Sequence, residues 1–275
     1  MIKQFQEYLV IGSKTHSFLQ NTMAFEKLNG IVLRYADYKE SDRILTVLTR
    51  ERGIVSLTAR GVRANRAASL SAVKDACCCG EFIVYERGHI VYVSSSAPIE
   101  SFYPIREDYD KLTSAAQIAR IAEKAATSDK SDALYSLVYH AFSFLAYSGS
   151  TPEDLLIAFA AKLIALEGYE PVITRCAICD RSVLNEKRIR FSNGHGGAIC
   201  DECAHDEPSY TASTMEALRR LLLLDVRNMD RVRLTAEMRA ELKTLVFDYL
   251  EYSLEQPVRL GYAKNSKNSK KPKKN

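Results

Sequence analysis

The sequence lacks any hydrophobic run long enough to cross a membrane. A transmembrane helix needs about 20 consecutive apolar residues, and no stretch of this 275-residue chain approaches that length. Near the N-terminus only the segment from Tyr8 to Ile11 is apolar, without the longer apolar segment and the small-residue cleavage site of a secretory signal. These absences predict a cytoplasmic protein that has no membrane partner.

The sequence also lacks the motifs of common catalytic sites. It contains no G-x-x-x-x-G-K-[ST] or G-x-G-x-x-G phosphate loop and no H-E-x-x-H zinc motif. The nearest group of carboxylates, formed by Asp37, Glu40 and Asp42, alternates with Lys39 and Arg43. This arrangement favours a turn crossed by ion pairs over a metal-dependent nuclease site. We therefore expect no enzymatic activity.

Cysteine is present in the pattern of a zinc ribbon. Two Cys-x-x-Cys pairs are separated by twenty residues, and their members are Cys176, Cys179, Cys200 and Cys203. Two such pairs can place four thiolates around one tetrahedral Zn²⁺. Because four cysteine ligands leave no open position for water, the spacing predicts a structural ion and not a hydrolytic centre.

The neighbouring histidines and the other three cysteines have simpler interpretations. His195 and His205 flank the second pair and could replace a cysteine ligand, but four thiolates make a histidine ligand unnecessary. The consecutive residues Cys77 to Cys79 are poor disulfide partners for one another, because adjacent residues on a strand point to opposite faces. We expect them to be buried thiols in a reducing compartment.

Positive charge is concentrated towards the two ends of the chain. Residues 24 to 106 carry 12 basic and 9 acidic side chains, residues 107 to 263 have a net charge of −6, and residues 264 to 275 have +6. From Arg60 to Lys74 four side chains are basic and none is acidic, in a stretch rich in Ala, Ser and Gly that predicts a mobile cationic loop. Such a distribution suits a phosphate backbone bound by one domain and one tail.

The N-terminal part has the short strands of a small barrel. Alternating or β-rich segments predict strands at Lys27 to Tyr35, Arg43 to Thr49, Ile54 to Ala59, Glu81 to Tyr85 and Ile90 to Ser94. Tight turns are expected at 51–53 and 87–89, each of which contains a glycine. Five strands with the longest connection between the third and the fourth are typical of an OB-fold barrel, and a small sandwich is the alternative.

After Pro104 the apolar period lengthens to about 3.6 residues, which predicts helices. One helical face carries Leu112, Ala115, Ala116, Ala119 and Ala122, and a second carries Leu134, Leu137, Val138, Ala141, Phe142 and Leu145. A third helix is expected from Thr151-Pro152 to Gly168, with an apolar side that carries Leu155, Phe159, Leu163 and Leu166. The cysteine pairs follow this helix, so the ribbon is inserted within a helical domain.

Two more helices are expected after the ribbon. Ser213 and Glu216 have the spacing of a capping box for a helix that runs to Leu224. Thr235 is expected to cap a longer helix, whose apolar side carries Met238, Leu242, Leu245, Tyr249 and Tyr252.

The sequence therefore predicts an α+β multidomain protein. We assign residues 1–22 to an N-terminal extension and 23–103 to an OB-fold nucleic-acid-binding domain. We assign 104–263 to a helical domain with a zinc ribbon at 174–206, and 264–275 to a disordered lysine-rich tail.

Basic and aromatic side chains of the barrel predict a nucleic-acid site. The candidate basic residues are Arg34, Lys39, Arg43, Arg60, Arg63, Arg66 and Lys74. The aromatic residues nearby are Tyr35, Tyr38, Phe82, Tyr85 and Tyr92, some of which must belong to the core. Each basic residue alone is more simply explained as part of a solvated face. Together with aromatic rings they allow phosphate neutralisation and base stacking, which favours single-strand binding with little sequence preference.

Several segments together resemble the RecO recombination mediators of bacterial DNA repair. The matching segments, in chain order, are Lys27 to Tyr35 with the continuation Ala36 to Asp42, Gly53 to Val55, Ala59 to Arg63, Leu166 to Pro171 leading into Cys176, and Phe191, Gly196-Gly197 and Cys200. The resemblance covers nearly all of the chain from Met23 to about Tyr262. The first 22 residues and the lysine tail lie outside it.

The resemblance implies a DNA-binding protein that uses no nucleotide cofactor. It implies binding of single- and double-stranded DNA, annealing of strands coated by single-stranded DNA-binding protein, and, with RecR, indirect assistance to RecA loading at the nucleoid. It places the OB-fold basic residues at Arg34, Arg43, Arg60 and Arg63, with Arg66 and Lys74 as additions. It also implies that a pocket of the helical domain captures the acidic, hydrophobic C-terminal tail of single-stranded DNA-binding protein.

Two other functions remain compatible with the sequence. A zinc-ribbon regulator of transcription or translation would bind nucleic acid with sequence or RNA selectivity. A zinc enzyme that acts on nucleic acid would need an open coordination position and would cleave DNA in a metal-dependent way. Neither explains the whole ordered set of matching segments.

Overall fold

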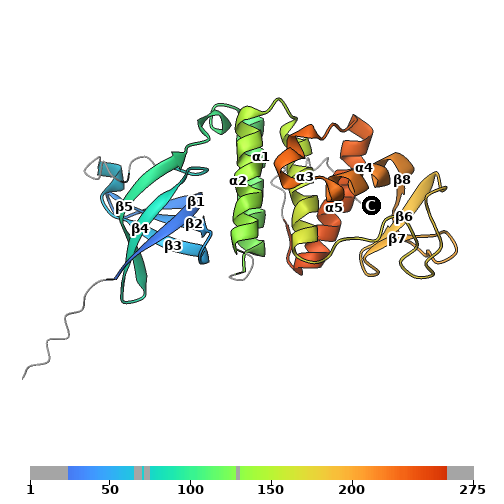
Figure 1. The fold of residues 1–275 in the computed structure, drawn as a ribbon, viewed down its shortest axis with the longest axis horizontal. Coiled ribbons are helices and arrows are strands. Elements are labelled where there is room, and N and C mark those ends of the chain that lie inside the picture. Colours follow the sequence, from blue (N-terminus) through green and yellow to red (C-terminus); the bar gives the residue numbers. More distant parts are fainter. Residues whose placement is uncertain (1–23, 65–69, 71–74, 128–130, 259–275) are drawn as a thin grey trace, which may run out of the picture.

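The N-terminal region of the protein is a closed five-stranded barrel (Figure 1). The computed structural model describes residues 24–64, 70, 75–127 and 131–258. The barrel strands are β1 (Phe25–Tyr38), β2 (Asp42–Thr49), β3 (Gly53–Ala59), β4 (Cys79–Arg87) and β5 (Ile90–Glu100). They pair in the order β1-β2-β3-β5-β4, and β4 returns to β1. This closed order confirms the expected OB-type barrel and excludes the sandwich.

Each predicted strand is present, and the turns lie where the glycines allow them. Gly53 and Gly88 adopt φ values of 66° and 65°, a left-handed conformation that an L side chain rarely adopts. They end the turns that lead into β3 and β5. β3 and β5 are the only parallel neighbours among the described barrel strands.

A short connection joins the barrel to the helices. Phe102 is fully buried with φ 44°, and the single turn η3 (Tyr103–Ile105) follows it. The helices are α1 (Tyr109–Ala125), α2 (Ser131–Tyr147), α3 (Pro152–Leu166), α4 (Ala212–Leu223) and α5 (Ala236–Leu254), with the turn η4 (Val226–Arg231) between the last two. Figure 1 shows α1 and α2 between the barrel and the remaining helices.

The barrel and the helices share one hydrophobic core. Barrel residues that face the helices, including Ile31, Leu33 and Leu48, belong to the same buried cluster as the interiors of all five helices. A second cluster fills the barrel itself and includes Val47 and Phe82. The outer wall of the barrel therefore packs on α1 and α2 as a hydrophobic surface rather than through a flexible linker.

Helix α3 lies at the centre of the helical region. Every residue from Leu155 to Ala161 is at most 1% exposed. The sequence predicted one apolar side for this helix, but neighbouring helices cover it on all sides. On α1 the expected face is only partly correct, because Ala115, Ala119 and Ala122 are buried whereas Leu112 and Ala116 are exposed. The predicted face of α2 is buried throughout.

The start of α4 differs from the predicted capping box. Thr211, not Ser213, is the N-cap, and its side chain accepts a hydrogen bond from the Thr214 N–H. Glu216 instead pairs with Arg219 and Arg220 further along the helix.

The cap of α5 is where the sequence predicted it. Thr235 accepts a hydrogen bond from the Met238 N–H. Leu242, Leu245 and Tyr249 of the expected apolar side are buried, but Tyr252 is 52% exposed.

A three-stranded sheet lies between α3 and α4 in the chain, at the end of the molecule opposite the barrel (Figure 1). Its strands β6 (Arg188–Ser192), β7 (Gly197–Ile199) and β8 (Ser209–Thr211) pair in the order β7-β6-β8. The sheet confirms an insertion within the helical region. Along the parts of the chain that the structure describes, no helix is both long and apolar enough to span a bilayer.

Gly30→Ala tests the packing of the barrel interior. A Cβ at this position would lie 2.3 Å from Val47 Cγ1 and 3.2 Å from a ring carbon of Phe82. We expect the substitution to lower the free energy of unfolding by about 1–3 kcal/mol, measured by urea denaturation. Gly149→Ala is the control, because its Cβ would meet nothing within 4 Å. Equal stability of the two variants would contradict this account of the barrel core.

Candidate functional site

The β1–β2 hairpin and the segment after β3 meet at one end of the barrel. The Arg63 N–H donates to the Ser41 carbonyl (3.0 Å), and the Gly61 N–H donates to Asp42 Oδ1 (2.9 Å). These bonds hold the segment after β3 against the hairpin. They bring together four of the predicted basic residues, which we call the hairpin-end cluster: Lys39, Arg43, Arg60 and Arg63.

Two members of the hairpin-end cluster are bound to carboxylates. The Arg43 side chain is 15% exposed, forms ion pairs with Asp37 (2.9 Å) and Asp75 (3.1 Å), and lies 3.9 Å from the centre of the Tyr35 ring. Burial opposes the charge of Arg43, but hydrogen bonds to the two carboxylates outweigh it and raise its pKa. Arg63 is 3.5 Å from Asp37. These two arginines hold the hairpin in place, and the carboxylates offset their charge.

The other two members keep their positive charge available. Among the described residues, neither Lys39 nor Arg60 forms an ion pair with a carboxylate. The Arg60 guanidinium lies 4.2 Å from the centre of the Tyr92 ring, and the Lys39 ammonium lies 5.2 Å from that of Tyr38. A cation placed over an aromatic ring can bind a phosphate while the ring remains beside it for a base.

Of the three remaining predicted basic residues the structure describes Arg34 alone, and it lies outside this cluster. Arg34 makes a bidentate pair with Glu123 of α1 (2.9 and 2.7 Å), which lowers the pKa of the Glu123 carboxyl and ties the barrel to the helices. Arg66 and Lys74 lie outside the residues that the structure describes. Of the predicted aromatic residues, Phe82 is core and fully buried, whereas Tyr35 and Tyr38 are 40% and 44% exposed.

The predicted carboxylate group is part of the same hairpin. Asp37 pairs with Arg43 and Arg63, and Asp42 accepts hydrogen bonds from Ser41 and Gly61. The ion pairing predicted for this hairpin is present at Asp37.

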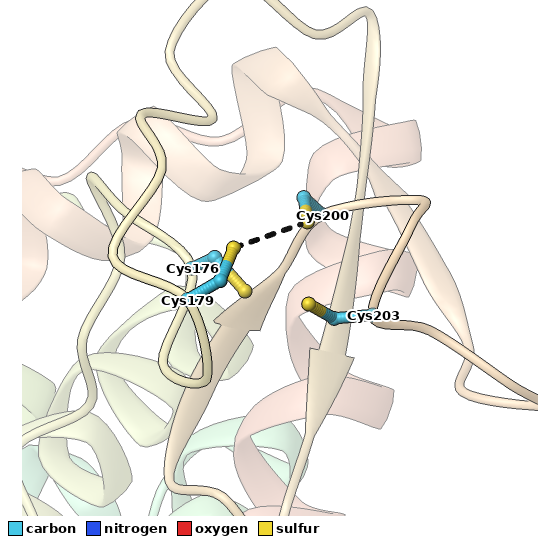
Figure 2. Close-up of side chains that lie close together, drawn as sticks. All are labelled: Cys176, Cys179, Cys200 and Cys203. Atoms are coloured by element: carbon cyan, nitrogen blue, oxygen red, sulfur yellow. Dashed lines mark hydrogen bonds between the residues drawn. The ribbon is translucent and has the colours of Figure 1, made fainter.

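The four ribbon cysteines point towards one another (Figure 2). Their sulfur atoms all lie within 4.8 Å of one another, and the Sγ atoms of Cys179 and Cys200 are 3.6 Å apart. A tetrahedral ion with sulfur ligands at about 2.3 Å needs sulfur–sulfur distances of about 3.8 Å. The donor set and its spacing therefore fit one metal ion. Neither His195 nor His205 belongs to the group, and His195 contacts Ser192 instead.

Backbone turns orient these sulfur atoms. The Cys176 carbonyl accepts from the Asp180 N–H, and the Cys200 carbonyl accepts from the N–H groups of Cys203 and Ala204. Burial opposes ionisation of Cys176, but hydrogen bonds from backbone N–H groups lower its pKa to about 6. Hydrogen bonds with the neighbouring thiols raise the pKa of Cys203 to about 12. Four thiolates so close together need a cation to balance their charge.

The ribbon is fixed to the helices by specific contacts. The Phe191 ring packs edge to face on Tyr249 of α5 at 5.2 Å, and the Tyr249 hydroxyl donates to the Tyr169 carbonyl (3.0 Å). Gly197 lies so close to Val172 that an added Cβ would be 2.4 Å from the Val172 carbonyl oxygen. This close approach explains why glycine occupies the position. The geometry of the metal site thus depends on the packing of the helices.

The other three cysteines are buried between the barrel and the helices. Cys77, Cys78 and Cys79 are at most 3% exposed. Burial raises the pKa of Cys77 to about 12, and Cys79 Sγ is 3.0 Å from the Tyr135 hydroxyl. The prediction that these three thiols are buried is confirmed.

Comparison with known proteins identifies the family. The model of the recombination protein O N-terminal domain matches residues 23–102, and that of the C-terminal domain matches residues 106–260. The chain belongs to the RecO family. The DNA repair protein RecO of Desulforamulus reducens is 31% identical over 241 residues, which cover 86% of this chain and 93% of that protein.

Two further RecO proteins match to a similar extent. The DNA repair protein RecO of Bacillus velezensis is 31% identical over 232 residues, which cover 82% of this chain and 89% of that protein. The RecO protein of Halalkalibacterium halodurans is 29% identical over 234 residues, covering 83% and 90%. These matches confirm the resemblance that the sequence segments indicated.

For this RecO protein the sequence identified the right residue types but not their partners. Arg34 and Glu123 are 89 positions apart, and no local pattern links them. The placement of Arg60 over Tyr92 follows from the parallel pairing of β3 with β5, which the sequence alone did not give.

Cys200→Ser tests whether the four sulfur atoms hold a metal ion. We expect the purified wild-type protein to carry one ion per chain, and the variant to lose it and to lose roughly 3 kcal/mol or more of unfolding free energy. Metal content is measured by elemental analysis and stability by thermal denaturation. Cys78→Ser is the control, because it alters an equally buried thiol that is outside the cluster. Loss of the ion without any loss of stability would refute a structural role.

Proposed function

We propose that this protein is a recombination mediator of DNA repair. It binds single- and double-stranded DNA through its barrel and anneals complementary strands that are coated with single-stranded DNA-binding protein. With RecR it assists the loading of RecA on DNA in the cytoplasm. It acts without a nucleotide cofactor and catalyses no covalent reaction. Membership of the RecO family supports this proposal, and the observation that carries it is the pair of uncompensated cations, Lys39 and Arg60, of which Lys39 lies beside the exposed ring of Tyr38.

The proposed mechanism is electrostatic. Two complementary strands repel each other, and side chains that neutralise their phosphates release bound counterions and let the strands approach. Arg60 is suited to this because a guanidinium is permanently charged and can bind phosphate in a bidentate way. Tyr35 and Tyr38 offer ring faces for unpaired bases. Annealing by this route needs no energy source other than base pairing.

We further propose that the ribbon metal is Zn²⁺ and that it has a structural role. Four cysteine sulfurs are the ligands that Zn²⁺ takes in closed tetrahedral sites. Cys176 and Cys200 are at most 2% exposed, and all four ligand positions are taken by protein atoms. When bound, the ion balances the charge of the thiolates and holds the two Cys-x-x-Cys turns together.

A groove in the helical region is our candidate for the tail of single-stranded DNA-binding protein. The groove has a volume of about 680 Å³ and lies between α4, η4 and the start of α5. Its apolar lining includes Leu221, Leu224 and Met238, and the charged side chains at its edge include Arg220 and Arg231. Arg231 has no carboxylate partner among the described residues. Apolar walls with an arginine rim suit an acidic, hydrophobic peptide.

An annealing experiment tests the proposed function. Two complementary oligonucleotides, one coated with the cognate single-stranded DNA-binding protein, are mixed with and without this protein in the absence of nucleotide. We expect rapid duplex formation that slows with rising salt. The double variant Lys39→Ala, Arg60→Ala should bind single strands more weakly, and the slope of log affinity against log salt should fall by about 1.4, for two lost phosphate contacts.

The matched control removes the same charge elsewhere. The double variant Lys111→Ala, Arg227→Ala lies in the helical region, where Lys111 binds a carbonyl and Arg227 binds Asp225. It should anneal like the wild type. Folded protein that binds nucleic acid but does not anneal would refute the mediator function, and a preference for RNA would favour a regulator of transcription or translation.

Arg231→Glu tests the groove. We expect it to weaken the binding of a labelled C-terminal peptide of the single-stranded DNA-binding protein by about 10- to 100-fold, the value of one charge-assisted contact. Annealing of bare strands should stay unchanged, whereas annealing of coated strands should slow. Arg227→Glu is the control, because Arg227 lies next to the groove but is paired with Asp225 and does not line it. Equal peptide binding by both variants would exclude this groove.

A further inference from the structure

A row of aromatic rings crosses the outside of the barrel. Phe25 of β1 pairs with Tyr85 of β4, and Tyr85 pairs with Tyr92 of β5. The ring centres of Phe25 and Tyr85 are 5.8 Å apart, and those of Tyr85 and Tyr92 are 5.4 Å apart in a stacked arrangement. The Arg60 guanidinium lies over the Tyr92 ring, 4.2 Å from its centre. We call Phe25, Tyr85 and Tyr92 the aromatic row.

The aromatic row faces outwards, away from the barrel interior. Side chains alternate along a strand, and Phe82 and Val84 of β4 point into the barrel core. Tyr85 must therefore point to the outer surface, and its pairing partners lie on the same face. Exposure rises along the row, from 8% at Tyr92 to 62% at Phe25. Packing alone does not account for the exposed ring at the end of the row.

The charges around the aromatic row suit a polyanion. Glu26 and Glu86 both pair with Arg52, and Glu81 pairs with Lys27. On the same face of β4 as Tyr85, Arg87 is exposed, and the described residues offer neither it nor Arg60 a carboxylate partner. Each of these three carboxylates has a basic partner, although Glu26 and Glu86 share Arg52, and Arg60 and Arg87 add two positive charges near the rings.

We propose that the aromatic row is a stacking surface for the bases of single-stranded DNA, with Phe25 as its outermost platform. Arg60 and Arg87 bind phosphates next to the row. The row adjoins the hairpin-end cluster through Arg60, so one strand can continue from the cluster on to the row. This inference rests on the proposed DNA binding and adds a path for the strand. Base stacking on aromatic rings tolerates any sequence, as a mediator requires.

A single tryptophan can report this stacking directly, because the natural chain has none. In Phe25→Trp the only indole lies on the proposed platform. We expect a thymidine oligonucleotide to quench most of its fluorescence, and an abasic oligonucleotide of equal length or a blunt duplex to quench little. Tyr109→Trp is the control, since residue 109 is 81% exposed on α1, away from the row. Its fluorescence should not respond. Binding is followed independently by the anisotropy of labelled oligonucleotides.

Phe25→Ala provides the second measurement. We expect its dissociation constant for single-stranded DNA to rise by about 5- to 100-fold, which corresponds to the loss of one stacked base. The salt dependence should be unchanged, because no charge is lost, and Phe25→Tyr should restore the affinity. Duplex affinity should stay the same, because paired bases cannot stack on the ring.

The outcomes separate this inference from the proposed function. If the wild type binds single strands but Phe25→Trp responds equally to thymidine and abasic oligonucleotides, or to neither, the row is only packing and the mediator function is unaffected. Wild-type affinity and salt dependence in Phe25→Ala would overturn the inference in the same way. If the wild type binds no DNA, both proposals are refuted together.

Discussion

The double pairing of strand β1 is the constraint on which the rest of the structure depends. Its first half pairs with β4 and its second half with β2, and this shared strand closes the barrel. Side chains alternate along β1, so Val32 lies in the barrel core while Ile31 and Leu33 pack with the helices. One strand thus forms the barrel wall, the contact with α1 and α2, and the first half of the hairpin that carries the basic residues.

At the end of the molecule opposite the barrel, the ribbon that carries the four cysteines is joined to the helices. The ribbon's apolar residues belong to the same buried cluster as the helices, so the cysteine turns rest on an already packed surface. Glu241 of α5 adds a polar link, because it accepts hydrogen bonds from Thr211 and Thr214 at the start of α4. These bonds lower the pKa of the Glu241 carboxyl, although its burial opposes the charge. The ribbon is therefore part of the helical fold and not a mobile appendage.

The features that the sequence predicted well are local. A period of two residues, glycines at turns and paired cysteines at ribbon spacing each describe a few neighbouring residues, and the structure confirms the strands and the clustered thiols. The α4 cap was mispredicted because Thr211 and Ser213 are equally suitable by sequence. In the structure Thr211 is the cap, and its N–H donates a hydrogen bond to Glu241, thirty positions away. The same limit applies to Arg34, whose partner Glu123 comes from another region of the chain. It applies also to α3, whose burial on all sides from Leu155 to Ala161 depends on where the neighbouring helices pack.

The shared core between the barrel and the helices has a consequence for how this architecture can change over generations. Ile31, Leu33 and Leu48 on the barrel wall are covered only while α1 and α2 lie against them. A gene fusion that joined this barrel to unrelated helices would leave an apolar surface in water and favour aggregation. The two halves must therefore be inherited as one unit. Variation is therefore restricted at the seam between the halves.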